Sequence, residues 1–149
     1  METKKILMAE DNPNDVELTL TALAEHNLAN EVIVARDGVE AMDYLYRRGR
    51  FDQMPNGNPL VIFLDLKMPR MDGLEVLRQV KGDPDLKTIP VVVLTSSAEE
   101  QDVVESYNLG VNAYVVKPVV FDNFIEVVKQ LGLFWVLMNE PPPGSVGRL

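Results

Sequence analysis

The chain has 149 residues, with 14 basic and 23 acidic side chains and a formal net charge of −9. This length is typical of one domain with a proper hydrophobic core. The negative charge argues against nucleic-acid and anionic-membrane partners, because their phosphates would be repelled. The chain has no cysteine and one histidine, which excludes disulfides, thiolate metal sites and histidine clusters. The first apolar stretch, four residues long, is too short for a signal peptide or membrane span, so we expect a soluble cytoplasmic protein.

Five short apolar runs recur along the chain and predict the strands of one sheet. Each run is continuous rather than alternating, which is typical of parallel strands that are buried on both faces. The runs are residues 6–9, 32–35, 60–64, 91–94 and 113–116.

Segments with helical spacing lie between these runs and have recognisable start signals. Helix starts are expected at Asn12, which precedes a proline, and at Asp37, Asp72 and Ser97, each with a glutamate three residues later. Five strand–helix units with right-handed crossovers place helices on both faces of the sheet. The sequence therefore predicts a doubly wound five-stranded parallel α/β fold, flavodoxin-like, with strand order 2-1-3-4-5.

Ligands in such a fold bind beyond the carboxyl ends of the strands, where the strand order reverses. The polar residues that follow the first, third, fourth and fifth predicted strands therefore gather at one edge of the sheet. They are Glu10, Asp11, Asp65, Thr95 and Lys117.

Three carboxylates in one shallow site repel one another unless a cation is present. Mg²⁺ is the expected ion, with Mn²⁺ as the alternative, because such ions prefer oxygen ligands. We expect Asp11, Asp65 and the Lys67 carbonyl to hold it, with Glu10 acting through water. The three carboxylates contribute −3, and Lys117 with Mg²⁺ contributes +3, so the loaded site is expected to be neutral.

Residue types at this site indicate phosphoryl transfer. Asp65 is a carboxylate that can act as a nucleophile and form an aspartyl phosphate. Lys117 and the Thr95 hydroxyl would neutralise and hydrogen-bond the transferred group, so catalysis would consist of positioning and charge stabilisation.

At these residues the chain resembles the chemotaxis-type receiver domain of bacterial two-component response regulators, over residues 4–133. The matching motifs are the Glu10-Asp11 pair, the LDLKMPRMDG stretch around Asp65, Thr95-Ser96, and the YVVKP stretch that begins at Tyr114. The stretches EDNPNDVELT and SYNLGVNAY are similar to those of phytochrome-associated single-domain response regulators.

The resemblance implies that a histidine kinase, such as a phytochrome-type photoreceptor, transfers a phosphoryl group to Asp65. It also implies a switch in which the Thr95 hydroxyl moves toward the phosphoryl group and the Tyr114 ring turns inward. The surface of the fourth helix, fifth strand and fifth helix would then change and be read by a downstream protein. A cis bond is expected between Lys117 and Pro118.

On this basis the chain is expected to be a phosphoacceptor signalling protein rather than an enzyme. It would promote its own Mg²⁺-dependent phosphorylation and dephosphorylation. Two positions depart from the common family pattern. Glu10 stands where many members have aspartate, and Lys67 places a cation two residues after Asp65, where its ammonium is expected to approach the phosphoryl group.

Residues 1–138 are expected to form one receiver domain, followed by a proline- and glycine-rich tail over 139–149 that is too short for an output domain. Residues 133–138 are six apolar residues in a row, and a helix cannot turn all of them toward one core. We expect a homodimer that involves the fifth helix and this segment; burial of the segment by the tail is the alternative.

Functions of other classes fit the sequence less well. A flavin carrier needs a phosphate loop rich in hydroxyl groups and glycine after the first strand, where this chain has EDNP. Aspartate-nucleophile hydrolases usually carry a second aspartate at the position of Lys67. The remaining alternative is a receiver-like binding module that works without phosphorylation.

Overall fold

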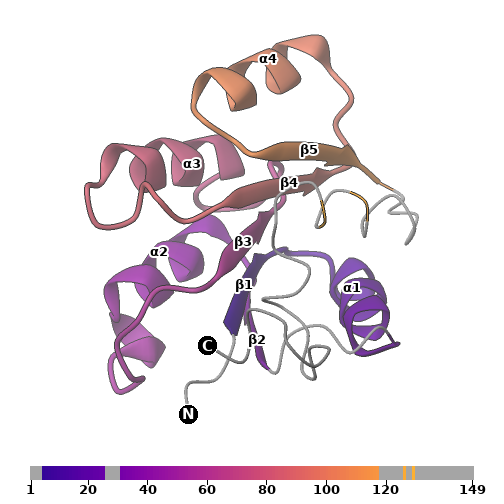
Figure 1. The fold of residues 1–149 in the computed structure, drawn as a ribbon. Coiled ribbons are helices and arrows are strands. Elements are labelled where there is room, and N and C mark those ends of the chain that lie inside the picture. Colours follow the sequence, from indigo (N-terminus) through magenta and orange to yellow (C-terminus); the bar gives the residue numbers. More distant parts are fainter. Residues whose placement is uncertain (1–4, 26–30, 118–125, 127–128, 130–149) are drawn as a thin grey trace, which may run out of the picture.

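The computed structural model describes residues 5–25, 31–117, 126 and 129 (Figure 1). The elements in chain order are β1 (Lys5–Ala9), α1 (Pro13–Glu25), β2 (Glu31–Ala35), α2 (Gly38–Tyr46), the 3-10 helix η1 (Gly49–Phe51), β3 (Val61–Leu64), α3 (Gly73–Gly82), β4 (Val91–Thr95), α4 (Glu100–Asn108) and β5 (Ala113–Val116). Within these residues, no helix is long and apolar enough to cross a membrane.

Several predictions concern parts of the chain outside the described residues. These are the fifth helix, the apolar segment 133–138 with its homodimer, the tail 139–149 and the cis bond to Pro118. They stay predictions.

The five strands form one parallel sheet in the order β2-β1-β3-β4-β5, which confirms the predicted topology. The register places Ile6 of β1 opposite Val32 of β2 and Val61 of β3. Helix α1 lies on one side of the sheet, and α2 and α3 lie next to each other on the other side (Figure 1). This arrangement is the doubly wound fold that the alternation of apolar runs and helices predicts.

Burial of the strands follows their place in the sheet. Every residue of β3 and β4 is buried, as the continuous apolar runs predict. The outer strands differ from that prediction: β2 has one buried residue, Ala35, and β5 has none. An edge strand lacks a neighbour on one side, so a continuous apolar run does not by itself mean burial on both faces.

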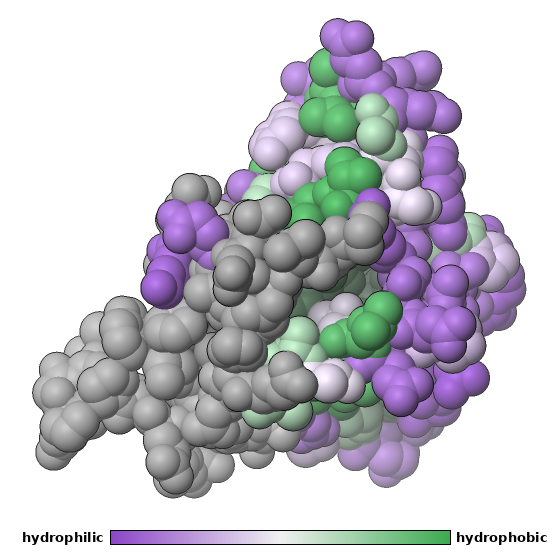
Figure 2. All heavy atoms as spheres, turned by 90° about the vertical axis from the view of Figure 1, so that its right-hand side faces the viewer, coloured by the Kyte–Doolittle hydropathy of each residue, from purple (hydrophilic) through white to green (hydrophobic). Residues whose placement is uncertain are grey.

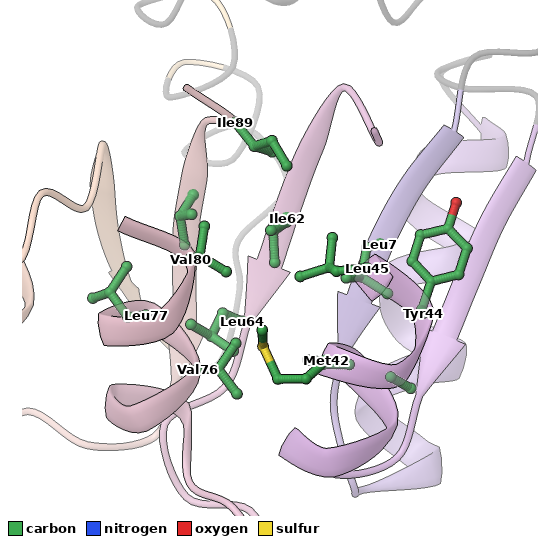
Figure 3. Packing of buried hydrophobic residues seen from close by; sticks show 14 of the residues in the cluster. Leu7, Met42, Tyr44, Leu45, Ile62, Leu64, Val76, Leu77, Val80 and Ile89 are labelled. Atoms are coloured by element: carbon green, nitrogen blue, oxygen red, sulfur yellow. The ribbon is translucent and has the colours of Figure 1, made fainter. Parts of the chain in front are cut away.

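Among the described residues, a hydrophobic core lies between the sheet and helices α2 and α3 (Figure 3). Leu7, Ile62 and Leu64 point from the strands toward Met42 and Leu45 on α2 and toward the buried face of α3. That face consists of Val76, Leu77 and Val80. Aliphatic side chains close-packed in this way hold the strands in a fixed register and thus fix the residues at the strand ends.

The helix starts confirm most of the capping predictions. The Asn12 side chain accepts a hydrogen bond from the backbone N–H of Asn14 at 2.9 Å, and α1 begins at Pro13. Asp37 and Asp72 likewise cap α2 and α3. The expected start at Ser97 is wrong, because α4 begins at Glu100. The Ser97 hydroxyl instead donates to the Asp102 side chain at 2.5 Å.

Most of the large apolar side chains among the described residues are buried or half-buried, but a few are exposed. They include Leu18 on α1, Val104 and Tyr107 on α4, and Val116 on β5. On the face shown in Figure 2, hydrophobic side chains form small patches between hydrophilic ones.

The start of α3 presses against the loop that follows β3. The Gly73 N–H donates to the Leu66 carbonyl at 2.9 Å. A Cβ atom at Gly73 would lie 2.2 Å from the Asp65 carbonyl oxygen, which is backbone and cannot swing aside. The backbone of α3 can therefore approach the Asp65 carbonyl this closely only because residue 73 is glycine.

Gly73→Ala is expected to reduce the free energy of unfolding by at least about 2 kcal/mol, because overpacking here displaces backbone rather than a side chain. Gly82→Ala, at the other end of α3, is the matched control, since a Cβ there meets nothing within 4 Å. We expect it to be neutral or slightly stabilising. Urea unfolding of the two variants tests this, and equal stabilities would contradict it.

Candidate functional site

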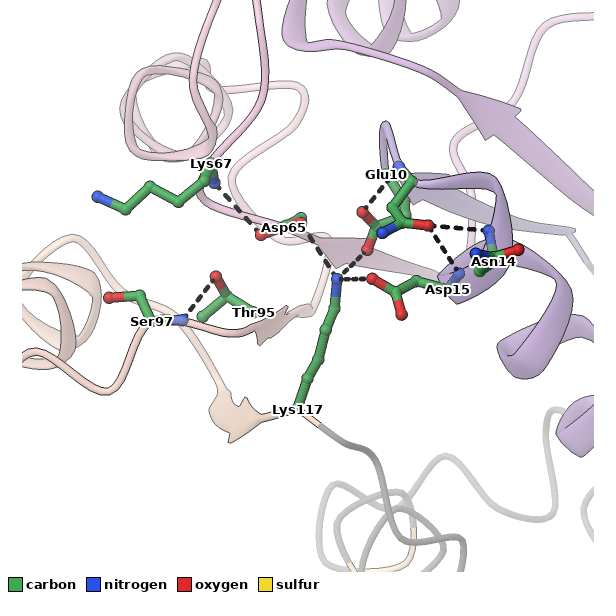
Figure 4. A network of polar contacts seen from close by, with 9 residues as sticks. Glu10, Asn14, Asp15, Asp65, Lys67, Thr95, Ser97 and Lys117 are labelled. Carbon is green, nitrogen blue, oxygen red and sulfur yellow. Dashed lines mark hydrogen bonds and ion pairs between the residues drawn. The ribbon is translucent and has the colours of Figure 1, made fainter.

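The carboxyl ends of four strands meet at one edge of the sheet, and their polar side chains converge there (Figure 4). Glu10 follows β1, Asp65 follows β3, Thr95 ends β4 and Lys117 follows β5. Backbone hydrogen bonds hold these positions side by side: the Asp65 N–H donates to the Ala9 carbonyl at 3.0 Å, and the Lys117 N–H to the Thr95 carbonyl at 2.8 Å. The edge predicted from the sequence is therefore the edge at which these residues gather.

The Lys117 ammonium lies at the centre of the cluster. Its Nζ is 2.5 Å from Glu10 Oε1, 2.8 Å from Asp15 Oδ2 and 3.2 Å from Asp65 Oδ2. An ammonium has three donor protons, so these carboxylates use all of them. The Lys117 side chain is 13% exposed, which makes the contacts much less screened than surface ion pairs.

Asp15 is the residue of this cluster that the sequence analysis missed. It lies in the first turn of α1, which begins directly beyond the end of β1. The first turn of this helix lies at the same edge of the sheet as the strand ends. An acidic residue in that turn is therefore the sequence signal that could have predicted the role of Asp15. Its carboxylate changes the charge of the site: four carboxylates, on Glu10, Asp11, Asp15 and Asp65, now stand against the one ammonium of Lys117.

The pKa values of the neighbouring carboxyl groups of Glu10 and Asp65 shift in opposite directions. Burial, together with the neighbouring Asp65, raises the pKa of Glu10 from 4.5 to about 7. Burial by itself would also raise the pKa of Asp65, but hydrogen bonds with Glu10 and Thr95 and the charge of Lys117 outweigh it and lower that pKa. Between about pH 4.5 and 7 the proton of the pair is therefore on Glu10, and Asp65 is ionised.

Lys117 stays charged despite its burial. Burial by itself would lower the pKa of this ammonium, but its bonds to Asp15 and Glu10 and the charge of Asp65 raise the pKa above its usual value. The site thus holds a permanent cation beside an ionised aspartate.

The acidic residues are spaced to hold a metal ion. Glu10, Asp11 and Asp65 can each offer one carboxylate oxygen, with all three oxygens within 4.8 Å of one another. Opposite ligands of a Mg²⁺ ion lie about 4.2 Å apart, twice the usual metal–oxygen distance, so the cluster fits such a cation. The ligand roles, including that of the Lys67 carbonyl, stay predictions.

The Lys67 ammonium does not contact the carboxylates of the site; its approach to a phosphoryl group stays a prediction. Its backbone N–H donates to Asp65 Oδ1 at 3.2 Å, while its side chain points away from the site (Figure 4). The ammonium lies 3.3 Å from Asp102 Oδ2 on α4. An ion pair with a nearly buried carboxylate competes well with a position in solvent beside Asp65.

Thr95 and Tyr114 lie on the side of the site that faces α4. Thr95 is completely buried, and its hydroxyl oxygen accepts the Ser97 N–H at 3.3 Å. The Tyr114 hydroxyl donates to the Ser97 carbonyl at 2.8 Å. Both residues of the predicted switch therefore contact the same residue, Ser97; their switch roles stay predictions.

Comparison with known proteins identifies one family. The model of the response regulator receiver domain matches residues 6–129. The response regulator Rcp1 of Synechocystis sp. is 41% identical over 133 residues, which are 89% of this chain and 89% of that protein. Its solved structure, a Mn²⁺-bound form, is 40% identical, with a TM-score of 0.76 over 93% of this chain and 99% of the other.

Two further solved structures are similar along most of the chain. The bacteriophytochrome response regulator RtBRR is 58% identical, with a TM-score of 0.84, and the match covers 98% of this chain and 88% of the other. The phosphorylated cyanobacterial phytochrome response regulator RcpA is 43% identical, with a TM-score of 0.76, over 91% and 95%.

The raised pKa of Glu10 predicts how stability depends on pH in the metal-free protein. Because the folded pKa lies above the unfolded one, the folded state binds more protons between pH 4.5 and 7, and stability falls as pH rises through this window. We expect the wild type to lose up to about 3 kcal/mol relative to Glu10→Gln, at about 1.4 kcal/mol per pKa unit. Urea unfolding in EDTA across this range measures the difference; parallel curves would contradict it.

Asp15 is expected to contribute to the pKa of Lys117. Asp15→Asn removes a charge that lies 2.8 Å from the ammonium and should lower that pKa. Asp11→Asn is the control, since it removes a carboxylate from the same edge and the structure records no Asp11–Lys117 contact. NMR titration of lysine side chains measures both, and an equal or larger effect of Asp11→Asn would argue against the assignment.

Proposed function

Because the chain belongs to the family of response regulator receiver domains, we propose that it accepts a phosphoryl group from a histidine kinase on Asp65. The observation that carries the proposal is the environment of this carboxylate. Asp65 is buried but ionised, lies 3.2 Å from the Lys117 ammonium, and shares a cation-sized set of oxygens with Glu10 and Asp11. A nucleophile held beside the Lys117 ammonium, at a site that can take a divalent cation, suits transfer of an anionic group.

The reaction needs no general base. A carboxylate oxygen of Asp65 attacks the phosphorus of the donor's phosphohistidine and forms a P–O bond. The P–N bond breaks, its electron pair leaves with the imidazole, and Asp65 becomes an acyl phosphate. Since Asp65 is already ionised, the proton that the pair retains on Glu10 does not obstruct the attack.

Lys117 would stabilise the transferred group. Its three donors all contact carboxylates, one of them Asp65 at 3.2 Å, the longest of the three contacts. When Asp65 is esterified, its oxygen loses charge, and the ammonium donor that it releases can pass to a phosphoryl oxygen. Thr95, buried beside Asp65, would donate its hydroxyl proton to another phosphoryl oxygen.

Glu10, Asp11, Asp65 and the Lys67 carbonyl would hold the metal ion. Mg²⁺, or Mn²⁺ in its place, supplies positive charge to the phosphoryl oxygens when bound. The Mn²⁺-bound relative Rcp1 supports this proposal. With Asp15 included and all four carboxylates ionised, one ammonium and a divalent ion would leave the site at −1, whereas the sequence count, which lacked Asp15, gave zero.

The partners follow from the relatives. RtBRR is named a bacteriophytochrome response regulator and RcpA a phytochrome response regulator, so a phytochrome-type kinase is the proposed phosphodonor. Output would pass through α4, β5 and the helix that follows β5. Thr95 and Tyr114 would transmit the change, because both contact Ser97 just before α4.

Incubation with acetyl phosphate and Mg²⁺, followed by intact mass measurement, tests the phosphoacceptor. We expect one phosphoryl adduct in the wild type, a loss of at least about 100-fold in Asp65→Asn, because the nucleophile is removed, and no adduct in EDTA. Asp52→Asn, a change at an exposed aspartate away from the cluster, should behave as wild type. Absence of any adduct in the wild type would favour a binding module that works without phosphorylation.

A further inference from the structure

A second polar cluster lies beside the acidic site, at the start of α4. Its centre is Asp102, which is 7% exposed although α4 is a surface helix. Asp102 Oδ2 accepts the Ser97 hydroxyl at 2.5 Å and lies 3.3 Å from the Lys67 ammonium. One carboxylate oxygen thus joins the loop after β3 to the segment between β4 and α4.

Both partners of Asp102 are also bonded to the acidic site. The Lys67 N–H donates to Asp65 Oδ1 at 3.2 Å, and the Ser97 N–H donates to the Thr95 hydroxyl oxygen at 3.3 Å. Asp102 itself touches neither Asp65 nor Thr95. It therefore acts on the site through two residues that each stand two positions after a site residue.

A phosphoryl group on Asp65 would change both of these hydrogen bonds. Its oxygens are better acceptors for the Lys67 N–H than an esterified Asp65 is, because they carry the charge. A Thr95 hydroxyl that donates to a phosphoryl oxygen must also turn, which changes the acceptor offered to Ser97. Each change moves a partner of Asp102, whereas the Lys67–Asp102 ion pair favours the arrangement without the group.

We propose that Asp102 is a positioning residue that ties Lys67 and Ser97 to the first turn of α4 in the unphosphorylated protein. Acceptance of a phosphoryl group then requires this tie to loosen. Release also frees the Lys67 ammonium, two residues from Asp65, to face the new negative charge. The inference rests on the proposed function and adds to it a restraint that opposes phosphorylation.

Asp102→Asn tests the restraint with little change of shape. The amide oxygen still accepts the Ser97 hydroxyl, but the ion pair with Lys67 is lost. We expect phosphorylation by limiting acetyl phosphate, followed by intact mass, to be about two- to fivefold faster than in the wild type, the range that a half-exposed ion pair supports. Added NaCl should accelerate the wild type more than Asp102→Asn, because salt screens the intact pair.

Substitutions of Lys67 separate positioning from plain packing. Lys67→Arg keeps the cation, so the acceleration by added NaCl that marks the intact pair should persist in this variant. Lys67→Gln breaks the ion pair at its more exposed partner. The Lys67 side chain is 60% exposed, so the substitution does not endanger folding. In the Lys67→Gln background, Asp102→Asn should add nothing further, because the pair is already broken.

Glu105→Gln is the matched control for an ion pair on the same helix. Glu105 pairs with Arg78 of α3 and has no contact with Lys67 or Ser97. The Glu105→Gln variant should be phosphorylated at the wild-type rate.

The outcomes separate this inference from the proposed function. If the wild type takes up no phosphoryl group, the proposed function fails, and the restraint fails with it. If the wild type is phosphorylated but Asp102→Asn is no faster, or if Glu105→Gln is accelerated equally, only the restraint is overturned. Additive effects of Lys67→Gln and Asp102→Asn would also overturn it.

Discussion

The contact of the Lys117 ammonium with three carboxylates is the interaction on which this site depends. It joins the end of β5 to β1, to the first turn of α1 and to the end of β3. Without a cation among them, carboxylates so close together would have to take up protons or separate. The parallel sheet makes the contact available, because all its strands end at the same edge.

The two acids that share the Lys117 ammonium differ in pKa although they are chemically similar. Glu10 and Asp65 are both buried, yet the pKa of Glu10 rises and that of Asp65 falls. The difference comes from partners: the hydrogen bond with Glu10 lowers the pKa of Asp65, and so do the Thr95 hydroxyl, the charge of Lys117 and the Lys67 N–H. One residue therefore stores a proton, and the other keeps the charge that a nucleophile needs.

The site is also connected to the surface through short side-chain contacts. Ser97 links Thr95, Tyr114 and Asp102, and Asp102 in turn binds Lys67. These contacts lie at the start of α4, where a shift of one or two side chains would alter the exposed face of the helix. Under the proposed function, these contacts are the route by which phosphorylation of Asp65 would affect the surface of α4.

The sequence alone determined the fold and most of the site. Continuous apolar runs with helices between them allow few topologies, and residues at strand ends must meet at the edge of a parallel sheet. Local patterns likewise predicted the caps at Asp37 and Asp72. These features depend on neighbours in the chain or on simple topology, which a sequence contains.

Only the tertiary structure decided which side chains pair. Asp15 binds Lys117, which lies 102 positions away in the sequence. The Lys67 ammonium pairs with Asp102 rather than with Asp65. The Ser97 hydroxyl donates to Asp102 instead of capping a helix. Each outcome depends on which donors and acceptors lie within reach of one another in the folded chain, and for the Lys67 ammonium Asp102 is the nearer acceptor. Distances in the folded chain decide such pairings, and spacing along the sequence does not contain those distances.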